Sequence, residues 1–396
     1  MTAAVRRTPY VLLELCDDAR LDLAALARGR PATAPDGVAV YAFAILTGRR
    51  DPVSLEELDL LLTLRTDRWT RPAPHQAEIV SGLLERGLLV ADSTEPALAE
   101  IREREHRLEA CRWNLCAAFY HYMSIWEGVD VRSEGDEAMW LIPEDESRRY
   151  AEAYGPAPPP FEPRTPRDAA IGLPPPASDG ALFGLLERRM TTRAFDTAAA
   201  LSAEDLSTVM FWVFGAHGYA RTLGDAIAIK RTSPSGGGLH PVDAYLLIAG
   251  VDGVDPGIYH YDGRHHALEP IARHEPPELR GMAADLMCGQ WYFGDAHVSI
   301  VLTARFARSY WKYRASEKAY AAILMDAAHL SQTLYLVSAE LGLGAFVTLA
   351  VNGRDVEARL GLDGVAEGVI AMAGLGPRLE GGSPREPRWA KRLEQI

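Results

Sequence analysis

Residues 230–241 read KRTSPSGGGLHP, and a run of apolar residues, AYLLI, follows at positions 244–248. The three glycines carry no Cβ atoms, so their backbone N–H groups can approach a flat or anionic ligand closely. Lys230 and Arg231 add positive charge directly upstream. The stretch favours a cofactor-binding loop ahead of a strand. For a glycine triplet considered alone, the alternative is a flexible loop without a ligand.

The composition is typical of a globular protein. Of 396 residues, 48% are apolar and 24% are charged, which allows two or three domains. The net charge of -13 opposes binding to nucleic-acid phosphates and to anionic lipid surfaces. No apolar run approaches the roughly 18 residues of a membrane-spanning helix, and the N-terminal residues do not resemble a signal peptide. We therefore predict a cytoplasmic protein that binds neither nucleic acid nor membrane.

Cysteine and histidine residues show no redox or metal-binding pattern. The cysteines are scattered, at Cys16, Cys111, Cys116 and Cys288. The spacing of Cys111 and Cys116 matches neither a CxxC pair nor a zinc knuckle, so we expect reduced and mostly buried thiols. His265 and His266 are adjacent, and adjacent side chains in a turn or strand point apart, which does not suit a shared metal ion. We expect no metal site.

The first 180 residues divide into three predicted segments. In residues 1–94, a helix is expected after the N-cap Ser54 with Glu57 three residues on, and RGLLV at 86–90 predicts a helix stop and a short strand. This order is typical of a winged helix, and its acidic residues favour peptide binding or a structural role over DNA binding. Residues 95–154 read as helical, with packed aromatic residues. The prolines of residues 155–180 predict a linker or an extended arm.

Residues 181–396 alternate predicted helices and strands. A short helix at 182–189 leads into an arginine- and threonine-rich turn that suits an anion such as a phosphate. Strands are predicted at 243–249, 257–262, 299–304 and 365–374, and a long apolar helix at 319–343. On that helix Asp326, His329 and either Gln332 or Thr333 form one polar stripe. We favour His329 as a hydrogen-bonded core residue over a catalyst.

Three motifs, in this order, resemble those of a known family. They are RRMTTRAF at 188–195, SPSGGGLHP at 233–241, and KY at 312–313 followed by DAAHLSQ at 326–332. With them, residues 182–379 resemble the FMN-dependent nitroreductase superfamily. Within it, the chain is similar to the SagB-type dehydrogenases, which oxidise azoline rings to azoles during the maturation of ribosomally made peptides.

The resemblance implies an α+β fold over 181–396, with a central antiparallel sheet flanked by helices, and a homodimer that binds FMN at the subunit interface. The arginine turn would meet the FMN phosphate and ribityl chain. The glycine loop, from the second subunit, would line the isoalloxazine edge, and a later segment would face N5. The residues implied are Arg189, Thr191 and Arg193; Pro234, Ser235, Gly236 and Gly237; Val347, Thr348 and Leu349; and Arg385 or Arg388 as a further phosphate ligand.

The resemblance also makes Lys312 and Tyr313 the catalytic pair of azoline oxidation. A lysine near other cations or under apolar cover can lose its proton near neutral pH, and a neighbouring tyrosine can relay one. Without the resemblance, Lys312 would suit a surface residue that caps a strand. Glycines usual in the family are replaced by Arg314 and Ala328, and Leu-Ala at 349–350 stands where a Gly-Gly pair is common.

The predicted activity is two-electron oxidation of a thiazoline or oxazoline in a precursor peptide, with a cyclodehydratase or another maturation enzyme as partner. Alternatives stay open. They are other flavin chemistry on a peptide, such as desaturation or reduction of dehydro residues; NAD(P)H-dependent reduction of a nitro compound or quinone; and a binding scaffold without catalysis. The long region before residue 181 argues against a minimal small-molecule reductase.

Overall fold

The computed structural model describes residues 3–21, 33–130, 179–222, 227–314 and 316–379, with isolated positions between 152 and 177. Most of residues 131–154, predicted helical, and of the linker predicted at 155–180 therefore lies outside the described residues. The backbone divides into two compact units. The first comprises residues 1–125, 304–325 and 360–368, and the second comprises residues 126–303, 326–359 and 369–396.

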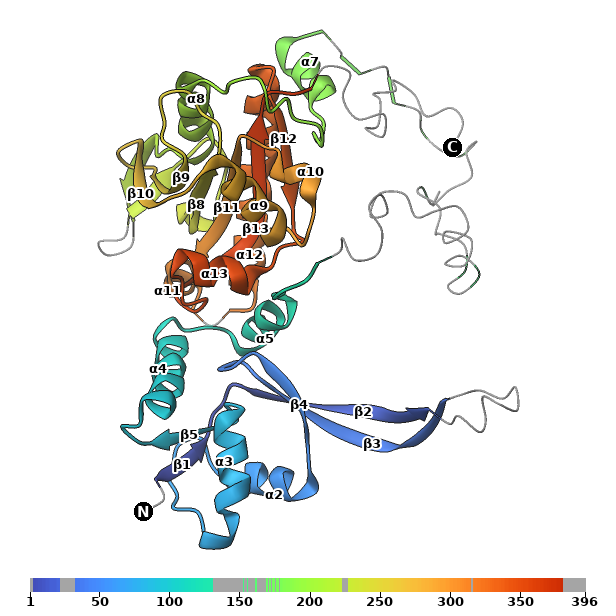
Figure 1. Ribbon diagram of the computed structural model, residues 1–396, viewed down its shortest axis with the longest axis vertical. Coiled ribbons are helices and arrows are strands. Elements are labelled where there is room, and N and C mark those ends of the chain that lie inside the picture. The colour runs from blue at the N-terminus through green and yellow to red at the C-terminus, as the bar shows by residue number, and fades with distance from the viewer. Residues whose placement is uncertain are drawn as a thin grey trace. The chain divides into compact units, whose positions relative to one another are not determined.

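The second unit is built on a six-stranded sheet with the order β10-β9-β8-β11-β13-β12. Its strands are β8 (Val242–Ile248), β9 (Gly257–Asp262), β10 (Ala267–Arg273), β11 (Val298–Arg305), β12 (Gly344–Thr348) and β13 (Glu367–Gly376) (Figure 1). The first three form an antiparallel meander, whose β8 and β9 correspond to the strands predicted at 243–249 and 257–262, and β12 pairs antiparallel with β13. β11 is buried along all but its last residue, so the centre of the sheet is covered on both faces.

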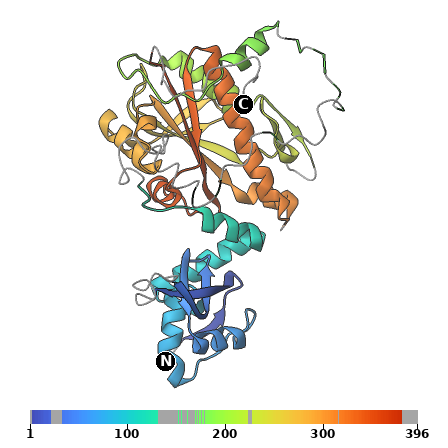
Figure 2. The ribbon, with the colours of Figure 1, turned by 90° about the vertical axis from the view of Figure 1, so that its right-hand side faces the viewer.

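Helices pack on both faces of this sheet, and α12 (Lys318–Glu340), the long orange helix in Figure 2, runs along one face. They are α8 (Ala203–Phe214), α9 (Pro276–Leu286), α10 (Trp291–Gly294), α12 and α13 (Gly353–Leu360). A further helix, α7 (Ala181–Arg188), has no buried residue and leads into the arginine turn. A small hairpin pairs β6 (Gly218–Arg221) with β7 (Ile227–Lys230). Apolar residues of α8 and α12, such as Val209 and Leu330, share one core with Leu246 and Ile300 of the strands. The predicted α+β fold is confirmed.

The ends of two helices in this unit follow from local sequence. The Ser202 hydroxyl accepts a hydrogen bond from the Asp205 N–H at 3.0 Å and so caps α8. Gly342 follows α12 with a φ of 72°, a left-handed conformation that suits glycine and ends the helix. The strand β12 starts two residues later.

The first unit combines two small sheets with helices. β1 (Ala4–Arg7) pairs with β5 (Leu89–Asp92), and β2 (Val11–Leu21), β3 (Thr33–Ala44) and β4 (Arg49–Val53) form a three-stranded sheet (Figure 1). Its helices are α2 (Leu55–Thr63), α3 (Ala77–Glu85), α4 (Pro96–Ala110), α5 (Leu115–Ser124) and α11 (Phe306–Tyr313), with a 3-10 turn at Pro74–Gln76. Leu61, Leu83 and Leu89 lie in one buried core. The first eight residues of α12 also belong to this unit.

The predicted capping box of α2 is confirmed. Ser54 Oγ accepts from the Glu57 N–H at 3.2 Å, and the Glu57 carboxylate accepts from the Ser54 N–H at 2.8 Å. The other oxygen of Glu57 pairs with the Arg86 guanidinium at the end of α3. One acidic side chain therefore satisfies the start of one helix and contacts the end of the next.

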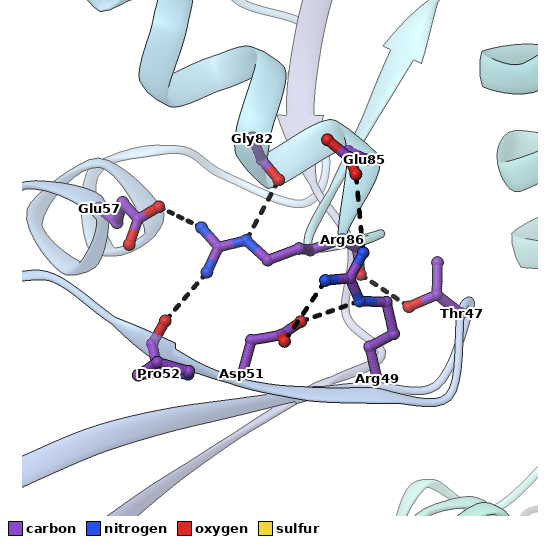
Figure 3. A network of polar contacts seen from close by, with 8 residues as sticks. All are labelled: Thr47, Arg49, Asp51, Pro52, Glu57, Gly82, Glu85 and Arg86. Atoms are coloured by element: carbon purple, nitrogen blue, oxygen red, sulfur yellow. Dashed lines mark hydrogen bonds and ion pairs between the residues drawn. The ribbon is translucent and has the colours of Figure 1, made fainter.

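Arg86 is the centre of a polar network, drawn in Figure 3. Its guanidinium donates to the carbonyl oxygens of Pro52 at 3.0 Å and Gly82 at 3.2 Å, and its own carbonyl accepts from the Thr47 hydroxyl at 2.7 Å. The ion pair with Glu57 is largely shielded from water, with side-chain exposures of 13% and 19%. Arg86 thus holds together the β3–β4 turn, the end of β4 and both helices.

The four cysteines are free thiols. Cys111 and Cys288 are buried as predicted, whereas Cys16 is half-buried and Cys116 is exposed. Burial raises the pKa of the Cys288 thiol to about 11. Among the described residues, no three His, Cys, Asp or Glu side chains gather as a metal-binding group. Within the same part of the chain, the helices are too short or too polar to span a bilayer.

Candidate cofactor site

The glycine-rich loop is fixed to α12 by Asp326. Ser235 Oγ donates a hydrogen bond to Asp326 Oδ2 at 2.5 Å, and the Gly236 N–H donates to Oδ1 at 3.2 Å. The Ser235 hydroxyl oxygen accepts in turn from the His240 N–H at 2.9 Å, which closes the loop on itself. Asp326 is only 5% exposed. A buried carboxylate therefore determines where the loop lies.

The electrostatics of Asp326 suit this role. Burial raises the pKa of its carboxyl above the ordinary value of 3.8, while the hydrogen bonds from Ser235 and Gly236 act in the opposite direction. The nearby side chains of His329 and Arg231 also favour the charged form. Because each carboxylate oxygen accepts a hydrogen bond from the loop, Asp326 acts as an anchor of the loop.

Two glycines of the loop adopt conformations that favour glycine. In the 3-10 turn Gly236–Gly238, φ is 64° at Gly237 and 68° at Gly238. A Cβ atom on Gly238 would lie 3.0 Å from the Ala228 Cβ, which is tighter than ordinary contact. Pro234 and Gly237 are exposed, so this edge of the loop is open to a ligand.

The polar stripe predicted on α12 is present, and it contacts the same loop. The Ser233 and Thr333 hydroxyls lie 2.6 Å apart, and both donate to the His329 carbonyl oxygen, at 3.3 and 3.0 Å. The prediction of a fully hydrogen-bonded His329 is wrong for one ring nitrogen. His329 Nδ1 is buried and has no hydrogen-bond partner among the described residues. A buried unpaired ring nitrogen beside a glycine loop is available to a ligand.

A second cluster is organised by Tyr335 of α12. Its hydroxyl shares a hydrogen bond with Thr191 Oγ1 at 3.0 Å and accepts from the Val347 N–H at 3.1 Å. The Arg189 guanidinium carbon lies 5.3 Å from the centroid of the Tyr335 ring. Next to it, the Thr192 N–H donates to the Ala345 carbonyl at 2.8 Å, which joins the arginine turn to β12. The structure thus brings together Arg189, Thr191 and Val347, which sequence analysis placed on one ligand.

The arginine turn also contacts the segment that follows β13. The Asp196 N–H donates to the Pro377 carbonyl at 3.0 Å, and the Leu379 N–H donates to the Ala194 carbonyl at 3.1 Å. An Arg378 guanidinium nitrogen lies 2.8 Å from the Met190 sulfur. Arg378 therefore joins Arg189 and Arg193 as a cation of this turn. Arg385 and Arg388, predicted as phosphate ligands, lie outside the described residues.

Within one chain, the predicted ligand-binding residues form two separate clusters, one at Asp326 and one at Tyr335. Asp326 and Tyr335 are nine residues apart on α12, which corresponds to about 13 Å of helix rise. Ser235 and Gly236 lie at the first position, and Thr191 and Val347 lie at the second. Of the remaining predicted residues, Thr348 is half-buried and Leu349 is 77% exposed.

Lys312 and Tyr313 lie at the C-terminal end of α11, in the first unit. Lys312 is exposed, and its Nζ lies 5.8 Å from the centroid of the Tyr313 ring. The helix ends at Arg314, which has a φ of 54°. The pair therefore stands on a helix and not at the end of a strand.

A family model supports the nitroreductase interpretation of this architecture. The model of the nitroreductase family matches residues 186–376, which include the arginine turn, the glycine loop, α12 and β13. These residues form a nitroreductase family domain.

Two curated relatives are similar to part of this chain. The trifolitoxin-processing protein TfxB of Rhizobium leguminosarum bv. trifolii is 28% identical over 144 residues, which cover 36% of this chain and 38% of TfxB. The microcin B17-processing protein McbC of Escherichia coli is 28% identical over 144 residues, 35% of this chain and 51% of McbC. The chain thus matches about half, or less, of the length of these relatives.

One solved structure extends the similarity beyond the nitroreductase domain. A chain of the E. coli microcin synthetase McbBCD complex with truncated pro-MccB17 bound aligns with 71% of this chain and 98% of its own length. The identity is 18% and the TM-score is 0.51, so the match shows the fold.

Several residues that organise the nitroreductase domain were not predicted. Tyr335 lies outside the polar stripe of α12, and Arg378 lies beyond the closing strand. Asp326 was expected on the stripe, but its role as the anchor of Ser235 was not. A buried aspartate among apolar helical residues was the available signal, because such a carboxylate needs hydrogen-bond donors from elsewhere in the chain.

Proposed function

We propose that this protein is an FMN-dependent dehydrogenase that oxidises thiazoline or oxazoline rings in a ribosomally made peptide to thiazoles or oxazoles. The observation that carries the cofactor assignment is the convergence of Thr191, Val347 and Arg189 on Tyr335 inside a nitroreductase family domain. The similarity to two peptide-processing proteins supports the class of substrate.

The residues present fit a flavin mononucleotide. Arg189, Thr191 and Arg193 supply cationic and hydroxyl donors suited to a phosphate, and Arg378 lies against the same turn. The glycine loop offers an exposed backbone edge without side chains, and His329 Nδ1 offers a buried donor or acceptor that the described residues leave unpaired. FMN, when bound, supplies the acceptor for the hydride.

The chain's own residues would place the substrate and take up a proton. In the proposed reaction the ring loses a hydride to the cofactor and a proton to a base. Lys312 is the proposed base and Tyr313 the group that relays the proton or orients the ring. Lys312 is exposed, so it is accessible to a peptide from solvent.

The rest of the chain is assigned by the same proposal. Residues 1–94 act as a winged-helix-like domain that holds the precursor peptide, residues 95–154 form a helical segment, and a proline-rich linker at 155–180 leads to the FMN domain at 181–396. The protein works in the cytoplasm as a homodimer, with the glycine loop of one subunit completing the site of the other. A cyclodehydratase or another maturation enzyme supplies the azoline.

The family itself favours a second candidate. Nitroreductase family membership of residues 186–376 suits NAD(P)H-dependent reduction of a nitro compound or a quinone, and this would need neither a peptide nor the N-terminal region. Other flavin chemistry on the peptide, such as desaturation or reduction of dehydro residues, would use the same cofactor site and the same Lys312–Tyr313 pair.

The experiment starts with the purified protein and an azoline-containing precursor peptide. We expect bound flavin by absorbance and a mass loss of about 2 Da per ring on incubation. Lys312→Ala should retain flavin and lose at least about 100-fold in kcat. Lys318→Ala, an exposed lysine of the same unit at the start of α12, is the matched control and should keep kcat.

Three results would contradict the proposal: protein without flavin, unchanged peptide mass, or Lys312→Ala with full turnover. Rapid NAD(P)H oxidation with a quinone, together with an unchanged peptide, would favour the second candidate.

A further inference from the structure

The helix that carries Lys312 and Tyr313 is anchored by buried aromatic rings. α11 presents Phe306 and Tyr310, four residues apart, and each is 0% exposed. The ring centroid of Trp113 lies 4.4 Å from that of Phe306 and 5.1 Å from that of Tyr310. Because residues four apart lie one above the other on a helix, Trp113 contacts two successive turns of α11.

Trp113 is itself held in place by the chain near residue 365. Its indole Nε1 donates to the Val365 carbonyl at 3.0 Å. The Asp363 carboxylate accepts from the Val365 and Ala366 N–H groups at 2.8 Å, and the Ala366 carbonyl accepts from the Phe306 N–H at 3.0 Å. One turn therefore connects Trp113 to the first residue of α11.

A second contact holds the start of the next helix. His121 Nδ1 and the Tyr320 hydroxyl are 2.9 Å apart, and His121 is 1% exposed. The His121 ring also lies edge-on to Phe306, with centroids 4.9 Å apart. Residues 113–122 thus contact both the first turn of α12 and α11, whose last two residues are Lys312 and Tyr313.

We propose that Trp113 is a positioning residue for the Lys312–Tyr313 pair. The inference rests on the proposed function, because it gives Trp113 a part in the same reaction. Lys312 follows Tyr310 by two residues on the same helix, so a shift of α11 against Trp113 displaces the lysine with the helix. The segment at 113–122 therefore supports the Lys312–Tyr313 pair.

The test is the full chain carrying Trp113→Leu. We expect kcat for the azoline peptide to fall by roughly 10- to 100-fold, while the KM for the peptide and the flavin content stay within about twofold. Amide hydrogen exchange of residues 306–313 should become faster. Trp113→Phe keeps a ring against Phe306 and Tyr310, so it should recover most of kcat and of the protection.

Phe214→Leu is the control for general loss of packing. Phe214 is a buried aromatic residue of α8 in the second unit and is 2% exposed. It is not one of the aromatic rings packed around Trp113, such as Phe306 and Tyr310. This variant should lower stability and leave both kcat and the exchange of residues 306–313 unchanged. Phe306→Leu is a smaller change in the same cluster and should repeat the effect of Trp113→Leu if that variant does not fold.

The proposal would be overturned by a Trp113→Leu or Phe306→Leu protein with normal kcat and normal exchange at residues 306–313. It would also be overturned if Phe214→Leu lowered kcat as much as Trp113→Leu does. These results are separable from failure of the proposed function. If Lys312→Ala is inactive and Trp113→Leu is normal, only the positioning role fails. If Lys312→Ala keeps full activity, the proposed base is wrong whatever Trp113 does.

Discussion

Asp326 connects the glycine loop to α12, because its two oxygens accept from the Ser235 hydroxyl and from the Gly236 N–H. Both donors belong to a loop whose glycines would otherwise be free to take many conformations. Glycines have no side chains whose packing could fix the loop, so the hydrogen bonds to the buried Asp326 carboxylate hold it in one conformation instead.

Asp326→Asn should weaken flavin binding. The amide retains one acceptor oxygen, but its nitrogen donates, so one of the two loop donors loses its partner. We expect the Kd for FMN to rise about tenfold, equivalent to about 1.4 kcal/mol. A fluorescence titration measures this. Gln332→Ala, an exposed position on the same helix, is the matched control, and an equal Kd in both variants would refute the anchoring role.

Asp363 gives a pH dependence of stability. Burial opposes its charge, but hydrogen bonds from the Val365, Ala366 and Glu367 N–H groups and the Arg107 guanidinium hold the pKa of its carboxyl below 3.8. A pKa lowered on folding stabilises the protein above the unfolded value, and this stabilisation is lost as the pH falls through the folded value. Asp363→Asn should therefore cost about 1–2 kcal/mol at neutral pH.

The difference between wild type and Asp363→Asn should shrink below about pH 3.8, as the wild-type carboxyl becomes protonated. Urea unfolding at neutral and at acid pH measures it. Asp59→Asn is the control, because Asp59 is an exposed aspartate of α2 in the same unit. A cost of Asp363→Asn that is the same at both pH values would contradict the assignment.

At the scale of elements, the first unit depends on the Arg86 network in Figure 3. Arg86→Ala removes donors to two carbonyl groups and leaves the partly buried Glu57 without its cation. We expect a loss of about 2–4 kcal/mol in the free energy of unfolding, since an uncompensated charge adds to the lost hydrogen bonds. Chemical denaturation followed by circular dichroism measures this loss.

Arg65→Ala provides the comparison for Arg86→Ala. Arg65 pairs with Asp67 at 2.8 Å, but both side chains are more than half exposed, at 70% and 64%. An exposed pair of this kind contributes little to stability, because water and salt screen the two charges. If both variants lose the same stability, the network does not hold the helices and β4 together.

The sequence was sufficient to predict where helices begin, but not which distant residues pack against them. The caps at Ser54 and Ser202 depend on groups three residues away, so the sequence contains both partners of each hydrogen bond. No helix was predicted from the sequence at the position of α11. Its eight residues form a helix with Phe306 and Tyr310 buried, and Trp113, almost 200 residues earlier in the chain, contacts both.

At the scale of the whole molecule, the proposed cofactor should stabilise the protein by mass action. FMN at about 100 times its Kd should raise the free energy of unfolding by about 2.7 kcal/mol. Riboflavin, which lacks the phosphate, should stabilise less at equal concentration, because the cations at Arg189 and Arg193 then have no anion to bind. Thermal unfolding of flavin-free protein with each ligand measures the difference. Equal stabilisation by both ligands would contradict phosphate binding at the arginine turn.

The sequence alone was sufficient for the fold class, the meander, the long helix and the list of segments that could bind a ligand. Strand alternation, helical spacing and capping act over a few residues, so their signals are local. Tertiary structure decided how those segments meet. Thr191 reaches Tyr335 across 144 residues, Ser235 reaches Asp326 across 91, and Trp113 reaches Val365 across 252. Such pairs form only when the packed core brings distant turns together, and no local pattern records which partner each will find.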